Sequence, residues 1–227
     1  MDPNVLKDII DWDTINWWKA IEYWENNIDL ENKKINCLEL GGRKGGLSLW
    51  LAMKGNNVVC SDLESPEKYA YEVHKKYECK SLIQYQAIDA TNISFENHFD
   101  IITFKSILGG ISRNNKNDLK KTIIDEIYKA LKINGVLLFA ENIEASFLHK
   151  IFRRLFVKWG NEWNYLKVKE IGNIFSSFKS VKYITVGFWG AFGRTEKQKN
   201  ILGKFDRLFE KIIPKEKRYI LIGIARK

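Results

Sequence analysis

A strand, a glycine-rich loop and a helix follow one another directly between residues 35 and 55, and this succession constrains the fold more than any other stretch. The run INCLEL is short and apolar, which is typical of a buried strand. GGRKGG follows as a loop, and LSLWLAMKG has the pattern of a helix that ends at a glycine. The strand delivers a carboxylate, Glu39, just before glycines that let backbone approach a ligand closely. We therefore expect the first crossover of an α/β sheet, with a ligand site at the end of the strand.

Strand-like and helix-like stretches alternate along the remainder of the chain. Residues 4–28 carry apolar side chains at helical spacing, which predicts one or two leading helices. Apolar runs predict further strands at 57–63, 82–88, 100–104 and 135–140, with helices at 65–77 and 119–131. Basic amphipathic segments follow at 146–159 and 167–178, then a strand at 181–186, a helix at 196–212 and a last strand at 218–225. This alternation is typical of a parallel sheet covered by helices.

The chain length suits one α/β domain, which we place over residues 1–227. Cys37, Cys60 and Cys79 show no CxxC spacing, so we expect buried free thiols rather than disulfides or a metal site. No apolar run approaches the roughly 20 residues that cross a bilayer, and the beginning of the chain is acidic where a signal peptide would be basic. These observations favour a cytoplasmic protein.

Acidic residues stand at three successive strand ends. Asp62 ends the second strand, 23 positions after Glu39, where a carboxylate can accept hydrogen bonds from both hydroxyls of a ribose. Alternatively, Asp62 caps the start of the following helix. Asp89 and Ala90 follow the third strand. Because the carboxyl ends of parallel strands meet at one edge of a sheet, we expect these residues to share one site.

The residues Glu39, Gly41, Gly42, Arg43 and Gly45 resemble the first motif of the class I S-adenosylmethionine-dependent methyltransferases, an acid at the end of a strand followed by G-x-G-x-G. Gly41 and Gly45 match the motif, whereas Arg43 replaces its middle glycine. FDIITFKSILGG resembles the family's fourth strand, and IYKALKINGVLLFAEN resembles its helix, turn and fifth strand. The resemblance covers about residues 15–142.

This resemblance implies a Rossmann-like methyltransferase fold, with about seven mostly parallel strands ending in an antiparallel pair and helices on both faces. It also implies S-adenosylmethionine as the cofactor. The cofactor would be held by a core at residues 34–142, which follows leading helices at residues 1–30. The glycine loop would cradle the amino-acid end of the cofactor, Asp62 and Leu63 would contact the ribose, and Asp89 and Ala90 the adenine. The alternative on this fold is a nicotinamide-dependent oxidoreductase, whose diphosphate needs the middle glycine that Arg43 occupies.

Three residues are candidates for the catalytic chemistry. Catechol-type relatives bind magnesium through acids after the fourth and fifth strands, but Lys105 stands in the first of these places, so we expect no metal. Lys105 could instead orient an anionic substrate, or simply extend its ammonium group into water. An alcohol acceptor needs a general base, for which His149 and Glu141 are the candidates, although Glu141 could merely cap the next segment.

The excess positive charge lies entirely in the last third of the chain. Residues 1–148 hold 18 basic and 22 acidic side chains, whereas residues 149–227 hold 19 and 6. Within residues 147–165, aromatic side chains alternate with basic ones, a mixture suited to a sugar face, a lipid surface or ordinary core packing. We expect residues 143–195 to cover the acceptor, with four side chains binding it: Arg153, Arg154, Trp159 and Trp163.

Together these patterns predict O-methylation of a small anionic or saccharide acceptor, phosphorylated or lipid-linked, as in surface-polysaccharide assembly, with peripheral membrane contact. Two alternatives remain open. A nucleic-acid methyltransferase would use the basic last third, although nucleic acid is the less favoured partner. A catalytically silent protein would bind the cofactor and act through protein contacts.

Overall fold

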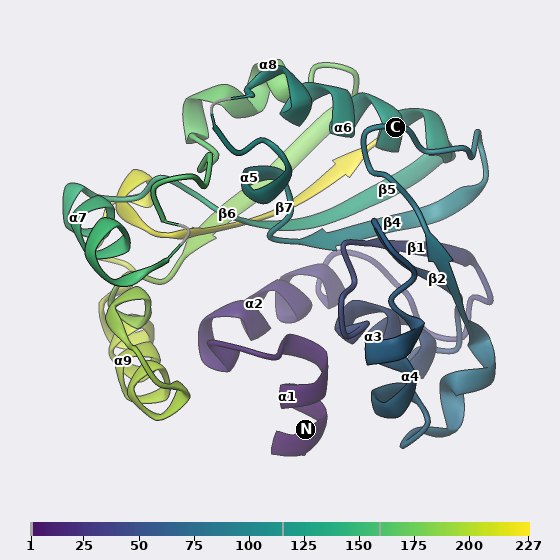
Figure 1. The fold of residues 1–227 in the computed structure, drawn as a ribbon, viewed down its shortest axis with the longest axis horizontal. Coiled ribbons are helices and arrows are strands. Elements are labelled where there is room, and N and C mark those ends of the chain that lie inside the picture. Colours follow the sequence, from purple (N-terminus) through teal and green to yellow (C-terminus); the bar gives the residue numbers. More distant parts are fainter. Residues whose placement is uncertain (1, 115, 159) are drawn as a thin grey trace.

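The computed structural model describes residues 2–114, 116–158 and 160–227, which form one central sheet with helices on both of its faces (Figure 1). The strands are β1 (Asn36–Leu40), β2 (Asn57–Asp62), β3 (Ile83–Ala87), β4 (Phe99–Lys105), β5 (Leu131–Asn142), β6 (Ser180–Val186) and β7 (Ile220–Arg226). They lie in the order β3-β2-β1-β4-β5-β7-β6. Pairing is parallel from β3 to β5, and β7 runs antiparallel to both β5 and β6. The predicted fold class is therefore confirmed.

The fifth strand is longer than the sequence pattern suggests. Leu131 pairs with Phe99, and after a register shift Val136 pairs with Ile101, so the polar turn expected before the strand lies inside it. The preceding helix ends at Ala130, one residue before its predicted end. Strand pairing continues across the register shift despite the local turn pattern, so β5 begins earlier than the sequence predicts.

Helices cover each face of the sheet and one of its ends (Figure 1). One face carries α1 (Pro3–Ile10), α2 (Thr14–Glu25), α3 (Gly46–Met53) and α4 (Glu67–His74). The other face carries α5 (Leu108–Ile111), α6 (Asp118–Ala130) and α8 (Ile171–Ile174). The helices α7 (Phe147–Phe156) and α9 (Glu196–Phe209) stand together on the left of Figure 1. Short 3₁₀ helices are η1 (Glu78–Leu82), η2 (Val168–Glu170), η3 (Trp189–Phe192) and η4 (Lys215–Lys217).

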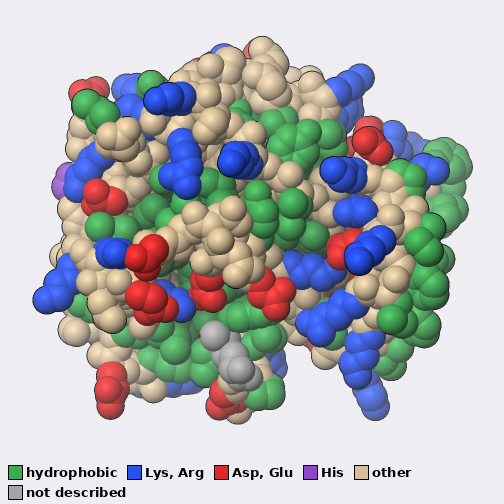
Figure 2. Space-filling view, turned by 180° about the vertical axis from the view of Figure 1, so that it is seen from behind, with side chains coloured by type: hydrophobic (Ala, Val, Ile, Leu, Met, Phe, Trp, Pro, Cys, Tyr) green, Lys and Arg blue, Asp and Glu red, His purple; other side chains and the backbone are tan. Residues whose placement is uncertain are grey.

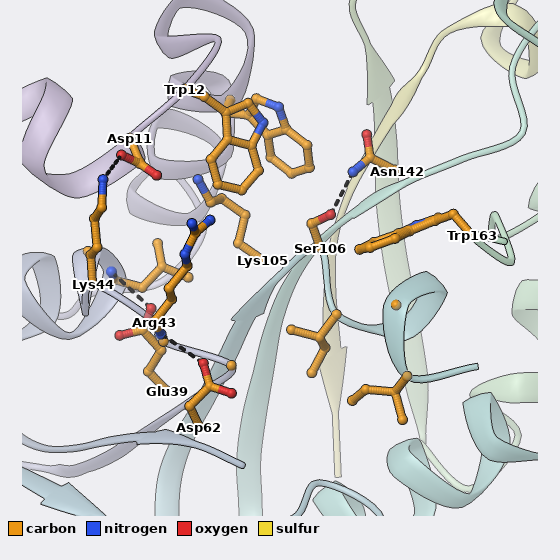
Figure 3. A pocket seen from close by; sticks show the side chains of 18 of the residues that line it. Asp11, Trp12, Glu39, Arg43, Lys44, Asp62, Lys105, Ser106, Asn142 and Trp163 are labelled. Carbon is orange, nitrogen blue, oxygen red and sulfur yellow. Dashed lines mark hydrogen bonds and ion pairs between the residues drawn. The ribbon is translucent and has the colours of Figure 1, made fainter. Parts of the chain in front are cut away.

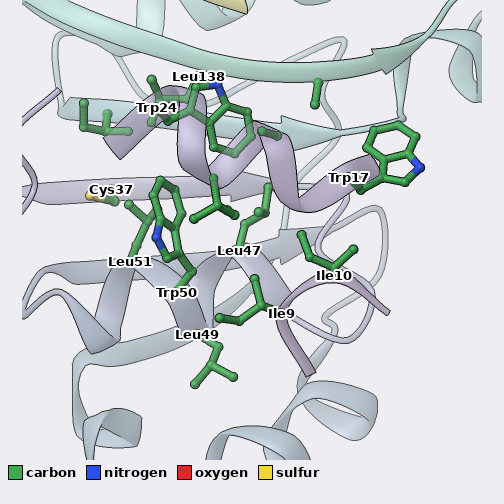
Figure 4. Packing of buried hydrophobic residues seen from close by; sticks show 14 of the residues in the cluster. Ile9, Ile10, Trp17, Trp24, Cys37, Leu47, Leu49, Trp50, Leu51 and Leu138 are labelled. Carbon is green, nitrogen blue, oxygen red and sulfur yellow. The ribbon is translucent and has the colours of Figure 1, made fainter. Parts of the chain in front are cut away.

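Three tryptophans anchor the core beneath the first face of the sheet (Figure 4). Trp17 and Trp24 lie seven positions apart on α2, on the same side of the helix as Ile21, and all three are buried. The indole of Trp24 packs near Trp50 of α3 and donates a hydrogen bond to the carbonyl of Gly223 in β7, at 3.1 Å. The leading helices are thereby fixed against the last strand, as well as against α3.

A second apolar cluster fills the other face. Phe139 stacks on Phe175, with ring centroids 4.5 Å apart, and three isoleucines of α6 pack beside them. With both faces buried, a ligand site falls at the carboxyl ends of the parallel strands. Cys37 and Cys60 are buried free thiols, while Cys79 in η1 is partly exposed, contrary to expectation. No helix in the described part of the chain is long and apolar enough to span a bilayer.

Candidate active site

A cavity of about 1110 Å³ lies at the carboxyl ends of β1, β2 and β4 (Figure 3). Its walls include the junction of α1 and α2, the loop after β1, the ends of the parallel strands, and side chains from the region of α7 to the start of β7. Small-molecule sites usually occupy roughly 300–1,000 Å³. This cavity therefore has room for a cofactor and a second small molecule.

The loop after β1 makes a tight left-handed turn. Gly41, Arg43 and Gly45 all have positive φ, of 65°, 47° and 69°. Arg43 thus adopts the backbone conformation that the missing middle glycine would favour, at a cost of about 1–2 kcal/mol for a residue with a Cβ. Its backbone N–H donates to Oδ2 of Asp62 at 3.0 Å, which offsets part of that cost. The path of the loop is kept despite the substitution.

Glu39, in β1 just before this loop, holds the start of α3, which follows the loop. Its carboxylate accepts hydrogen bonds from the backbone N–H of Leu47 (3.2 Å) and Ser48 (2.8 Å) and from the Ser48 hydroxyl (2.5 Å). Burial raises the pKa of Glu39 to about 7, although these hydrogen bonds oppose the shift. Glu39 also lines the cavity. The acid of the first motif therefore fixes the start of α3 at the cavity wall.

The cavity brings together nearly all the residues expected to hold the cofactor. Its lining contains seven of them besides Glu39: Gly41, Gly42, Arg43, Asp62, Leu63, Asp89 and Ala90. The carboxylate of Asp62 accepts from the backbone of both Arg43 and Leu63. Gly45 is placed differently, because it faces the core and its carbonyl accepts a hydrogen bond from His74 Nε2 at 2.8 Å.

Lys105 at the end of β4 extends into the cavity beside Trp12 (Figure 3). Its ammonium nitrogen donates to the carbonyl of Ile10 and lies 3.6 Å from the ring centroid of Trp12 and 5.5 Å from that of Trp17. Burial lowers the pKa of Lys105 to about 7. The side chain is therefore held inside the cavity, and does not extend into bulk water.

Ser106 and Asn142 line the same wall, where β4 and β5 end side by side. The Asn142 amide donates to the Ser106 hydroxyl at 2.6 Å (Figure 3). Asn142 therefore faces the cavity, and the neighbouring Glu141 faces the other side of the sheet. Glu141 is fully buried and accepts from the backbone N–H of Leu108 and Asn142, at 2.8 and 2.9 Å. It caps the short helix α5, and burial raises its pKa to about 7.

His149 also lies outside the wall of the cavity, against the expectation for a general base. Its Nδ1 contacts the Ser146 hydroxyl at 2.7 Å, and its Nε2 contacts the carbonyl of Phe188 at 3.0 Å. Only a protonated Nε2 can donate to a carbonyl, so Nδ1 accepts from the serine in the neutral ring. Burial lowers the pKa of His149 to about 4. The imidazole links α7 to the segment before η3, and both ring nitrogens are engaged.

The residues expected to bind the acceptor are divided by the structure. Arg153 and Trp163 line the cavity. Arg153 is buried, donates to the carbonyls of Ile143 and Glu144 at 2.8 and 3.2 Å, and lies 4.0 Å above the ring of Tyr165. Arg154 is exposed on the outer side of α7. Trp159 lies outside the described residues.

One buried acid in the cavity wall was not predicted from the sequence. Asp13, between α1 and α2, accepts a hydrogen bond from the phenol of Tyr219, and both residues line the cavity. Its backbone N–H donates to both carboxylate oxygens of Glu196, at 2.9 and 2.8 Å. Burial raises the pKa of Asp13 to about 6, against the lowering effect of the Tyr219 hydrogen bond and the charge of Lys199. The motif DWD at the break in the leading helical pattern was the one signal available.

Metal ligands are not clustered in the site. Within residues 2–114, 116–158 and 160–227, no group of three or more His, Cys, Asp or Glu side chains is arranged to hold a metal ion. At the place where catechol-type relatives carry a first acid, the side chain present is Lys105.

Comparisons with known proteins agree with this geometry. Residues 38–139 match the sequence model of a family described as methyltransferase domain. A search of curated proteins finds no match to this chain.

Solved structures share the fold at low sequence identity. Phosphoethanolamine N-methyltransferase 2 of Haemonchus contortus, in complex with phosphomonomethylethanolamine and S-adenosylhomocysteine, is 16% identical with a TM-score of 0.61. The alignment covers 93% of this chain, which spans only 52% of that protein.

Two further structures are similar over most of both chains. A SAM-dependent methyltransferase of Methanosarcina mazei is 16% identical, with a TM-score of 0.62 and coverage of 90% and 96%. The geranyl diphosphate C-methyltransferase of Streptomyces coelicolor is 11% identical, with a TM-score of 0.63 and coverage of 93% and 79%. Residues 38–139 thus match a methyltransferase domain, and the sheet has the Rossmann-like fold of S-adenosylmethionine-dependent methyltransferases, to which this chain is similar.

Proposed function

We propose that this protein methylates an oxygen of a small polar acceptor, a sugar or another polar metabolite that is phosphorylated or lipid-linked, as in surface-polysaccharide assembly in the cytoplasm. One observation carries the proposal. A single cavity extends from the strand-end acids Asp62 and Asp89 to a second wall of polar and aromatic side chains that includes Lys105, Asn142 and Tyr219. The first wall suits the cofactor, and the second suits the acceptor.

The first wall fits S-adenosylmethionine in its chemistry. Asp62 and Asp89 offer carboxylate oxygens to hydroxyl and amine donors, and Ala90 and Ile88 give an apolar surface for a base. At the other end, the guanidinium of Arg43 extends from the loop into the cavity, where it can pair with a carboxylate (Figure 3). When bound, the cofactor supplies a methyl group on a positively charged sulfur. Structures of related fold contain S-adenosylhomocysteine, which supports this assignment.

The second wall fits an acceptor that is both polar and partly anionic. Lys105 and Arg153 place positive charge in it, and Trp12, Trp163 and Tyr165 provide flat faces for a sugar ring or an aliphatic chain. Proteins of similar fold were solved with phosphomonomethylethanolamine and with geranyl diphosphate, both small and phosphorylated. These ligands support the acceptor class without identifying the acceptor.

Asp13 replaces His149 and Glu141 as the general base in this proposal. Its carboxylate lines the cavity, whereas those two side chains are occupied elsewhere in the fold. With a pKa of about 6, Asp13 is ionised at neutral pH and can accept the proton of an acceptor hydroxyl. The phenol of Tyr219 donates to one carboxylate oxygen and so orients the group.

The proposal is tested in two steps, binding and turnover. Calorimetry with S-adenosylmethionine, S-adenosylhomocysteine and NADH is expected to give binding of the two sulfur compounds alone. Methyl transfer to a panel of sugars, sugar nucleotides, phospholipids and RNA is then followed by mass spectrometry, with methylation expected at a hydroxyl of a small or lipid-linked acceptor. Methylation of RNA alone, or only at an amine nitrogen, contradicts the acceptor assignment.

A further inference from the structure

Two amphipathic helices leave apolar side chains in contact with solvent at one end of the molecule. On α7 the exposed residues are Phe147, Leu148, Ile151, Leu155 and Phe156. On α9 and the turn after it they are Ile201, Phe205, Leu208, Phe209 and Ile212. Each set recurs at helical spacing, so each forms a continuous stripe. Leu208 and Ile212 are 72% and 78% exposed, and the grouping of ten such residues on two adjoining helices distinguishes them from single exposed apolar residues elsewhere. We call these two stripes together the α7–α9 face.

The α7–α9 face belongs to one continuous surface. Both helices pack against η3, whose Trp189 is itself 42% exposed. Figure 2, seen from the opposite side to Figure 1, shows hydrophobic side chains along the right-hand edge with Lys and Arg beside them. The apolar area therefore spans two helices.

Positive charge borders this face. Exposed cations on or next to the two helices are Arg154, Lys158, Lys197, Lys204, Arg207 and Lys211. Lys150 is exposed as well, although it pairs with Glu144 at 2.7 Å. The sequence of α7 contains no acid.

The acids of α9 are turned toward the protein instead. Glu196 accepts the backbone N–H of Asp13. Asp206 is buried and accepts the backbone N–H groups of residues 188–190 at 2.7–2.9 Å. At the end of α9, Glu210 pairs with Lys19 at 3.0 Å. The outward side of α9 therefore combines apolar groups with cations, and its carboxylates are used inside the fold.

We infer that the α7–α9 face docks on the surface of an anionic phospholipid membrane. Helices with an apolar stripe and a lysine- and arginine-rich flank lie in the interface of a bilayer, where the apolar groups enter the acyl boundary and the cations meet the headgroups. A nucleic acid would neutralise the cations but leave the apolar stripes in water. Symmetric pairing of two copies through this face would bring like charges together. The anionic bilayer satisfies both kinds of group.

Docking would place the acceptor end of the cavity beside the membrane. Arg153 and Val157, at the inner side and end of α7, line the cavity, and so does Lys199 of α9. The two helices thus have one side in the cavity wall and the other on the docking surface. This arrangement favours an acceptor that is itself an amphiphile, with its polar head in the cavity. That part of the inference rests on the proposed function.

The test measures binding to lipid vesicles without cofactor or acceptor, so that its outcome is independent of methyl transfer. Vesicles of phosphatidylcholine alone are compared with vesicles that also contain phosphatidylserine, by sedimentation at low and high salt. We expect the protein to bind the anionic vesicles at least about tenfold more tightly than the neutral ones, with the difference reduced by salt.

Three triple variants locate the binding surface. The variant Leu155→Ser, Leu208→Ser, Ile212→Ser removes apolar side chains from the face, and we expect it to lose about tenfold or more in affinity for anionic vesicles. The matched control Met53→Ser, Tyr69→Ser, Ile133→Ser removes exposed apolar groups elsewhere and is expected to bind as wild type does. The variant Arg154→Gln, Lys204→Gln, Arg207→Gln is expected to lose the preference for anionic lipid.

Several outcomes overturn the inference. Circular dichroism and thermal unfolding first establish that each variant is folded. Equal binding by the face variant and the control shows that lipid is bound elsewhere. Absence of vesicle binding by the wild-type protein, or a dimer in light scattering that the face variant abolishes, assigns the surface to another partner. Binding of RNA that depends on the three cations but not on the apolar residues likewise assigns the surface to a partner other than a membrane.

Discussion

The two ends of the cavity are assembled in different ways. The cofactor end comes from strand ends and the loops that follow them, at residues 39–63 and 88–91. The acceptor end joins side chains far apart in the chain, such as Asp13 and Tyr219, which lie 206 positions apart. In the first case each residue is placed by the strand before it. In the second case each residue depends on how helices pack over the sheet.

This difference separates what is common to the family from what is particular to this chain. Parallel strands must end at the same edge, so any sequence that forms them brings Asp62 and Asp89 together. Nothing comparable forces a residue between two leading helices to meet the last strand. We therefore expect substitutions at the two ends to affect different steps, cofactor binding and methyl transfer respectively.

The largest effect is expected at the acceptor end, for Asp13→Asn. Loss of the carboxylate that accepts the hydroxyl proton should lower kcat/KM by about 10²–10⁴-fold, the usual range for a general base. Affinity for S-adenosylmethionine should change by less than about twofold, since Asp13 belongs to the other wall. Steady-state kinetics and calorimetry on the same preparation measure the two quantities. A comparable loss in both would remove the distinction between the ends.

The next effect is expected at the cofactor end, for Asp62→Ala. Hydroxyl donors of the cofactor would lose a charged acceptor, at a cost of about 1–3 kcal/mol, or roughly 5–150-fold in dissociation constant. Calorimetry measures this loss. The control Glu64→Ala removes an exposed acid two positions away and should bind the cofactor as wild type does. Unchanged affinity in folded Asp62→Ala would contradict the assignment of this carboxylate.

A smaller effect, confined to the acceptor end, is expected in the pH profile. Because the pKa of Asp13 is about 6 and the ionised form is the active base, kcat/KM should fall by about tenfold per pH unit below pH 6. The Tyr219 hydrogen bond lowers this pKa, so Tyr219→Phe should move the acidic limb to higher pH. The charges of Lys199 and Glu196 act on the same carboxylate and stay in place in this variant. A limb that Tyr219→Phe leaves unmoved would show that another group titrates.

The smallest effect is expected from removing divalent metal. Lys105 holds the place of the first acidic ligand after β4, and its ammonium group is bound to the Ile10 carbonyl and stacked on Trp12. A lysine there offers no carboxylate oxygen to a divalent ion, so turnover should be unchanged by EDTA. The measurement is the methyl-transfer rate with EDTA, with and without added magnesium. Loss of activity that magnesium restores would place a metal ion in the reaction.

The features that can be predicted from the sequence are divided in the same way between the two ends of the cavity. The succession of strands and helices along the chain, the glycine loop and the residues at the ends of β2 and β3 follow from alternating local patterns, which the sequence displays directly. The order of the strands within the sheet does not follow from them and comes from the structure. The left-handed φ of Arg43 is a local feature too, but the residue type argues against it, and the hydrogen bond to Asp62 that offsets part of its cost is seen only in the structure.

The expected bases show why the acceptor end was harder to foresee. Successive residues of a strand face opposite sides, so a shift of one position decides whether Glu141 or Asn142 meets the cavity. His149 and Arg153 lie one turn apart on α7. The longer Arg153 side chain binds the carbonyl of Ile143, just after β5, and lines the cavity, whereas His149 does not line it. Asp13 can be recognised as a site residue only in the structure, where the phenol of Tyr219 donates a hydrogen bond to it.

The contact between Asp13 and Tyr219 also bears on how the protein is made. A ribosome delivers the leading helices first and β7 last, so the strand-end acids leave the exit tunnel well before the acceptor wall can close. Contacts this far apart in sequence form late, because the intervening chain must be ordered before they are gained. A nascent chain halted before Tyr219 would lack Trp24's carbonyl partner at Gly223 and the phenol that orients Asp13. On the proposed role of Asp13, methyl transfer therefore requires that β7 has been translated and paired.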